Sequence, residues 1–133
     1  MLGRLLYAAT AIGLSVIAVP AVARDPVPIR MMIGGDDGLT LRLAEAIEER
    51  LRTSGRFVLA PAGSNPTILH IVIPSNVRWE PVGNRIRVHL QLEFRRGEAG
   101  EAFGFIEGTC WETELSVCAR QALFAATTAL EAN

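Results

Sequence analysis

The stretch RIRVHLQLEF, residues 85–94, alternates polar and apolar side chains without a break. Successive side chains of a β-strand point to opposite faces, so each face of this strand has one character. The apolar face carries Ile86, Val88, Leu90, Leu92 and Phe94. The polar face carries Arg85, Arg87, His89, Gln91 and Glu93. The pattern predicts a strand in a sheet that buries one face in a core and presents the other to solvent.

Further strands and two helices are predicted on both sides of this strand. The other strand-like runs, each bounded by glycine, proline or charged residues, are residues 29–33, 56–60, 67–73 and 102–108. Apolar side chains recur at helical spacing in residues 39–54 and 113–130, which predicts a helix in each segment. The apolar residues of the second helix are mainly alanines, and such small side chains let a helix lie close to a sheet.

The order of these elements is β-α-β-β-β-β-α. This order predicts an α+β fold in which two helices pack on a mostly antiparallel sheet of four to five strands. The strand-helix-strand unit at residues 29–60 would add one parallel pairing, and the sheet would then be mixed. Residues 67–73 are apolar on both faces except at His70, so we expect a central strand with His70 in or near the core.

The first 23 residues have the pattern of a secretory signal peptide. Arg4 is followed by an uncharged, mainly apolar run at residues 5–19, and Pro20 precedes the small-x-small site Ala21-Val22-Ala23. We expect cleavage after Ala23, leaving a single α+β domain at residues 24–133 that is periplasmic or secreted. The alternative is an inner-membrane anchor at residues 5–23, because this run approaches the roughly 20 residues that a transmembrane helix needs.

The charge balance argues against two classes of partner. Of 13 basic side chains, Arg4 is lost with the leader, which leaves 12 basic and 14 acidic side chains and a net charge of about −2. Nucleic acid and anionic membrane surfaces attract strongly basic proteins. We therefore expect no nucleic-acid partner and no membrane insertion after cleavage. No cysteine stands near the cleavage point, so a lipidated amino terminus is not expected either.

The two cysteines, Cys110 and Cys118, have the spacing C-x7-C. This spacing matches neither a C-x-x-C redox motif nor a zinc knuckle. Cysteine pairs of exported proteins are commonly oxidised, because the compartment outside the cytoplasm is oxidising. We therefore expect a disulfide between them that holds the last helix against the preceding strand. A metal site or a redox role is the alternative, but His70 and His89 alone could complete a metal site, and both are distant in sequence. No metal and no cofactor are predicted.

No catalytic residue is predicted either. The segment GGDDGLT, residues 34–40, lacks the Gly-Lys-Ser/Thr of a phosphate loop and the alternating acids of a calcium loop. Asp36 or Asp37 is instead expected to cap the first helix. No serine stands in a G-x-S-x-G elbow.

Two surface features could bind a partner. Arg85, Arg87, His89 and Glu93 are expected to project from one sheet face, where an anion or the carboxylates of a partner could bind. An ordinary solvated sheet face is the alternative. Trp79 and Trp111 lie near predicted turns and could contact a partner protein, although tryptophan packs in cores as well.

The segment GLTLRLAEAIEERLRTSGRFVLAP, residues 38–61, resembles a group of bacterial envelope domains. The resemblance covers residues 29–60 and, more loosely, the following strands and the last helix. The pattern is a helix of the form L-x-x-x-I-x-x-x-L, then S-G-x-F and a short strand, and it rests on Leu43, Ile47, Leu51, Gly55 and Phe57. The group includes the amino-terminal domain of TolB and small domains of penicillin-binding-protein activators and curli-secretion lipoproteins. The chain departs from the pattern in lacking a lipidation cysteine and an attached propeller. The resemblance implies a non-catalytic domain that works through protein contacts.

Together these observations predict an exported, periplasmic, non-catalytic protein-interaction or envelope-assembly module with a protein partner in the cell envelope. A periplasmic protein that binds a small ligand or anion on the polar sheet face is the first alternative. An enzyme without identified catalytic residues is the second alternative. The partner, the pathway and the oligomeric state do not follow from the sequence.

Overall fold

The computed structural model describes residue 13 and residues 25–61, 68–97 and 100–132. The chain begins with β1 (Val27–Ile33), α1 (Gly38–Thr53) and β2 (Phe57–Leu59). The four remaining strands are β3 (Leu69–Ile73), β4 (Arg78–Val82), β5 (Arg85–Arg96) and β6 (Ala102–Trp111). A short 3₁₀ turn, Glu112–Glu114, leads into α2 (Leu115–Glu131). The expected signal peptide or anchor lies outside the described residues, apart from residue 13. Among the residues that are described, no helix has the length and apolar character to cross a membrane.

All six strands form one mixed sheet. β1 pairs in parallel with β2 and with β3, whereas β5 pairs antiparallel with β3, β4 and β6. The predicted α+β class is confirmed, and the sheet has one strand more than the sequence pattern predicted. The additional strand is β4, whose sequence RWEPV is exposed at all five positions. With no buried face, its residues show no alternation, and its proline is tolerated because β4 pairs with β5 alone among the described strands.

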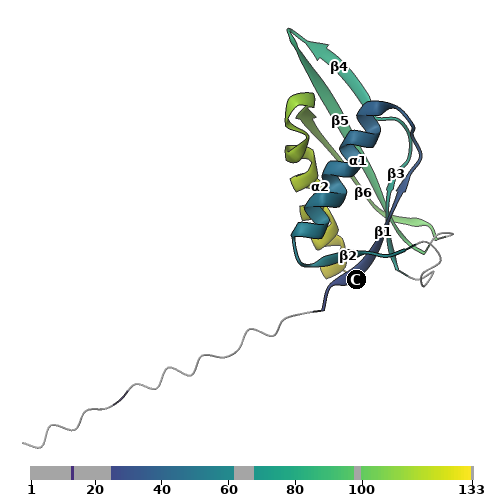
Figure 1. Cartoon of the computed structure of the whole chain (residues 1–133). Helices are drawn as coiled ribbons and strands as arrows, with labels where there is room; N and C mark the ends of the chain where they lie inside the picture. The colour runs from purple at the N-terminus through teal and green to yellow at the C-terminus, as the bar shows by residue number, and fades with distance from the viewer. Residues whose placement is uncertain (1–12, 14–24, 62–67, 98–99, 133) are drawn as a thin grey trace, which may run out of the picture.

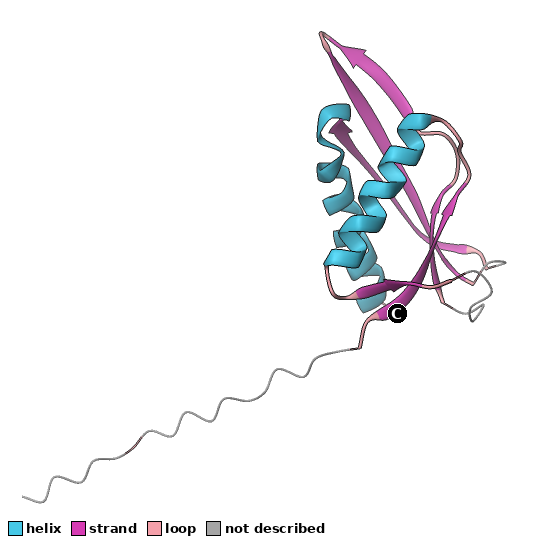
Figure 2. Cartoon of the chain, in the orientation of Figure 1, coloured by secondary structure: helices cyan, strands magenta, loops and turns pink. Residues whose placement is uncertain are grey.

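Both helices cover the same face of the sheet (Figures 1 and 2). From α1, Leu43, Ile47 and Leu51 enter the core, and α2 contributes mainly small residues such as Ala122 and Ala126. The predicted apolar face of β5 is confirmed, since Val88, Leu90, Leu92 and Phe94 are buried. Ile86 is only half-buried, near the start of β5.

The strands β3 and β4 lie along the same edge of β5, one after the other. Val72 of β3 lies opposite Glu93, and Arg78 of β4 lies opposite His89. Five residues separate Val72 from Arg78, whereas three separate Glu93 from His89 on β5. The chain between β3 and β4 is therefore too long for regular pairing, and it leaves the ladder as a loop at residues 74–77.

The central strand β3 is buried at every position, as its sequence predicted. His70 is 2% exposed and lies on the face that the helices do not cover, between Arg30 of β1 and Arg95 of β5. The expected capping of α1 is also confirmed: Asp37 is the N-cap, and its carboxylate accepts a hydrogen bond of 2.7 Å from the Thr40 amide.

Candidate protein-contact surfaces

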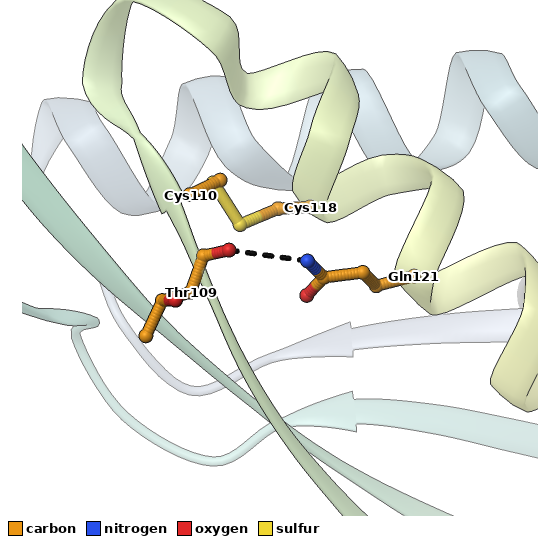
Figure 3. Close-up of a disulfide and its surroundings, with 4 residues drawn as sticks. All are labelled: Thr109, Cys110, Cys118 and Gln121. Atoms are coloured by element: carbon orange, nitrogen blue, oxygen red, sulfur yellow. Dashed lines mark hydrogen bonds between the residues drawn. A yellow bond between two sulfur atoms is a disulfide. The ribbon is translucent and has the colours of Figure 1, made fainter.

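The predicted disulfide between Cys110 of β6 and Cys118 of α2 is confirmed (Figure 3). Their Cα atoms are 5.6 Å apart, and both residues are buried in the core. The bond holds the first turn of α2 against the end of β6, as the sequence predicted. In the described parts of the chain, no three histidine, cysteine or acidic side chains gather in a way that could hold a metal ion.

A hydrogen bond next to the disulfide fixes α2 further against β6. The Gln121 side-chain nitrogen donates to the Thr109 carbonyl oxygen at 3.1 Å (Figure 3). The approach is possible because Gly108 has no side chain: a Cβ at that position would collide with the Gln121 amide. The disulfide and this bond together set how closely α2 lies under β6.

The polar face of β5 carries a cluster of mixed charge and not a row of free cations. Glu80 of β4 accepts from Arg87 at 3.3 Å and lies 3.2 Å from the His89 ring nitrogen. Arg85 stacks on the Trp111 ring at 4.0 Å and lies 3.9 Å from Glu114. The acidic neighbours offset much of the positive charge that a bound anion would need.

Glu93 lies on the same face but belongs to a different group of side chains. Its carboxylate pairs with Arg95 at 2.6 Å, further along β5 and close to β3. The structure thus places all four predicted residues on one face, although Glu93 does not join the other three. Their role as a binding face stays a prediction.

The two tryptophans point to opposite faces of the sheet. Trp111 lies opposite Arg87 on the uncovered face, whereas Trp79 lies opposite Val88, whose side chain points to the helix-covered face. Trp79 is 55% exposed all the same. They therefore cannot form one contact surface, and partner contact remains a separate prediction for each.

A surface that the sequence reasoning missed lies along the outer edge of β6. Within the described residues β6 pairs with β5 alone, so no strand covers its other edge. Phe105 of β6 is 64% exposed, and Phe124 of α2 is 76% exposed. A groove of about 570 Å³ runs between β6 and α2, lined by Ile106, Gly108, Val117, Gln121, Phe124 and neighbouring residues. In the sequence, the alternating phenylalanines Phe103 and Phe105 of AFGFIEG, residues 102–108, could have indicated this surface.

No family model matches the chain, and no curated protein matches it. A minor lipoprotein from Acinetobacter baumannii is structurally similar at 9% identity, with a TM-score of 0.52 over 72% of this chain and 89% of that chain. PelC from Paraburkholderia phytofirmans, solved as a dodecamer, is 17% identical, with a TM-score of 0.50 over 78% of this chain and 89% of that chain.

TolB from Acinetobacter baumannii is also similar, at 12% identity and a TM-score of 0.48. The match covers 80% of this chain but 29% of TolB. The expected resemblance to bacterial envelope domains is confirmed as a structural likeness at low identity to the minor lipoprotein and PelC. At such identities these two likenesses show a shared fold and nothing about partners or activity.

Proposed function

We propose that the chain is an exported, periplasmic, non-catalytic protein that works through protein contacts in the cell envelope. The free outer edge of β6, with exposed Phe105 and Phe124 beside it, carries the proposal. An unpaired strand edge presents backbone donors and acceptors that an extended segment of another protein can pair with. We therefore place the partner contact along β6.

The groove beside β6 supplies the side-chain contacts that such a strand needs. Backbone pairing gives affinity without selectivity, and pockets for alternate side chains give selectivity. Val117, Phe124 and Ala125 form an apolar wall on α2, and Phe105 stands on the other face of β6. Aromatic side chains of this exposure are more typical of contact surfaces than of free surface.

Three further observations support an envelope location. The amino-terminal segment has the pattern of a signal peptide, and the Cys110–Cys118 disulfide is typical of an oxidising compartment. Among the proteins with the same fold, one is named a minor lipoprotein. All three observations favour an extracytoplasmic location.

Site-specific photo-crosslinking in the cells that produce the protein tests the contact along β6. A photoreactive phenylalanine analogue at position 105 or 124 should give discrete crosslinked products in the periplasmic fraction. The matched control is position 41, because Leu41 lies on α1 and is 45% exposed. Products of the same mass from position 41, or none from positions 105 and 124, would contradict the proposal.

Small-ligand binding on the polar face is a second candidate function. It is favoured by a hollow of about 320 Å³ on that face, lined in part by His89. An enzymatic role is a third candidate, and no residue of the described chain is assigned to it.

A further inference from the structure

The hollow beside His89 exists because β3 and β4 do not join into one strand. Residues 74–78 form one wall of the hollow, where the chain leaves the ladder between β3 and β4. Residues 89–91 of β5 form the floor, and residues 107–109 of β6 form the far wall. Such irregularities in strand pairing commonly lie at binding sites, because they re-aim side chains out of the sheet.

The loop that forms the near wall is held in place from behind. The Asn76 side-chain oxygen accepts hydrogen bonds from the amides of Asp36 at 2.8 Å and Asp37 at 3.0 Å. The Val77 amide donates to the hydroxyl of buried Thr40 at 2.9 Å. Gly35 packs so closely on Asn76 that a side chain there would collide with it. A wall that is already ordered lowers the entropy cost of binding a ligand.

The two walls carry opposite charges. Arg78 stands on the near wall and Glu107 on the far wall. Neither forms an ion pair with another described residue, although other charged residues on this face, such as Arg87 and Glu80, do. Gln91 and Thr109 lie on the floor and the far wall and can add neutral donors and acceptors.

The separation of the two charges follows from the strand register. Arg78 lies opposite His89 on one side of β5, and Glu107 lies opposite Gln91 on the other side. Two strand spacings and two residues along the strand place their Cα atoms about 12 Å apart. A molecule with opposite charges at its two ends could therefore bridge them, whereas a simple anion would meet the Glu107 carboxylate.

We infer that this hollow binds a small zwitterion, either an amino acid or a short peptide with free ends. Its carboxylate would bind Arg78 and its ammonium group would bind Glu107. The volume of about 320 Å³ lies at the lower end of ligand sites, and the exposed Pro74 on the near wall offers apolar contact for a small side chain. The inference specifies the second candidate function and does not depend on strand docking at β6.

Titration of the ¹⁵N-labelled protein, produced from the full sequence, with alanyl-alanine tests the inference by NMR. Saturable shifts should centre on the amides of residues 75–78, 89–91 and 107–109. Blocking the amino group, as in N-acetyl-alanyl-alanine, or the carboxylate, as in alanyl-alanine amide, should weaken binding about tenfold or more. Arg78→Gln and Glu107→Gln should each weaken binding of the free dipeptide to a similar extent.

Matched controls are Arg50→Gln and Glu45→Gln, because both residues are exposed on α1, away from the hollow. These variants should bind the dipeptide as the wild type does. No saturable shift at about 10 mM dipeptide would overturn the inference. Equal binding of the acetylated peptide would overturn the zwitterion assignment but leave ligand binding on this face standing. Equal weakening of dipeptide binding by the control variants would also overturn the inference.

Discussion

Thr40 shows how a single buried hydroxyl can connect two parts of the chain that are distant in sequence. It lies in the first turn of α1 and is completely buried. Its oxygen accepts from the Val77 amide at 2.9 Å, and its own amide donates to Asp37. A buried amide needs such a partner, because leaving it unpaired costs free energy. The helix start and the loop before β4 are therefore held by the same residue.

We predict that Thr40→Val destabilises the protein, although the two side chains have nearly the same shape. The Val77 amide would lose its acceptor, and the free energy of unfolding should fall by about 1–3 kcal/mol in urea denaturation. Thr53→Val is the control, because the exposed Thr53 hydroxyl bonds only to carbonyls of its own helix. An equal loss of unfolding free energy in both variants would show that the hydrogen bond between Thr40 and Val77 contributes no more to stability than the hydrogen bonds of Thr53.

Neighbouring residues on β5 should respond very differently to truncation. Leu90 is 1% exposed and faces the core, so Leu90→Ala should lower the free energy of unfolding by about 2–5 kcal/mol. His89 lies on the uncovered face, and His89→Ala should cost much less, since no core cavity forms. Chemical denaturation of both variants measures the difference. Similar losses would mean that the two faces of β5 are assigned the wrong way round.

The cap of α1 should make stability depend on acidity. Hydrogen bonds from the Thr40 amide and then the Thr40 hydroxyl hold the pKa of Asp37 below its ordinary value. A carboxyl whose pKa is lower in the folded state stabilises the fold above its unfolded pKa, and that contribution is lost as pH falls through the folded pKa. Stability should therefore decline below about pH 4 partly through this residue.

Asp37→Asn should reduce that decline, because asparagine also caps helices but does not ionise. The free energy of unfolding, followed from pH 6 to pH 2, should thus fall less steeply in this variant than in the wild type. Asp25→Asn, before β1, is the comparison variant and should keep the wild-type slope. Parallel curves for wild type and Asp37→Asn would show that Asp37 does not contribute to the loss of stability at low pH.

At the scale of elements, α2 is attached to the sheet by a few close contacts. Its core residues are mainly alanines, which bury little apolar area each. The Cys110–Cys118 bond and the Gln121–Thr109 hydrogen bond both act on its first half. We therefore expect the disulfide to contribute a large share of the stability of this helix.

Replacing Cys110 and Cys118 by serine together should lower the melting temperature without changing the fold. Restricting the unfolded chain across so short a loop contributes about 2.5 kcal/mol, which corresponds to about 10 °C or more for a domain of this size. Calorimetry measures the shift, and circular dichroism tests the fold. The double variant should match the reduced wild type. Two free thiols titrated in the unreduced protein would contradict the disulfide and reopen the metal and redox hypotheses.

At the scale of the whole molecule, the position of the mature amino terminus decides whether the protein is free or anchored. If signal peptidase cleaves after Ala23, the intact mass should correspond to a chain beginning at Arg24. The protein should then stay in the supernatant when disrupted cells are centrifuged. A chain that retains Met1 and sediments with membranes would establish the anchor at residues 5–23 instead.

Much of the fold could be predicted because it depends on local periodicity. The alternation at residues 85–94 assigned both faces of β5, and helical spacing located both helices. The disulfide could be predicted because the spacing of the two cysteines and their expected oxidising compartment left few alternatives to it. Arg85, Arg87 and His89 share one face, as the alternation predicted, while their role as a binding face stays a prediction. Their acidic partners Glu80 and Glu114 were not foreseen, since they come from other elements.

The sequence by itself determined which side chains are buried in β5 and in the two helices, because burial there repeats with the period of the element. Only the tertiary structure decided that β3 and β4 share one edge of β5, that this pairing leaves a hollow between Arg78 and Glu107, and that β6 ends the sheet. Strand order and register depend on contacts between distant segments, and no local period records them. β4 shows this directly, since a strand with no buried position has no pattern to read.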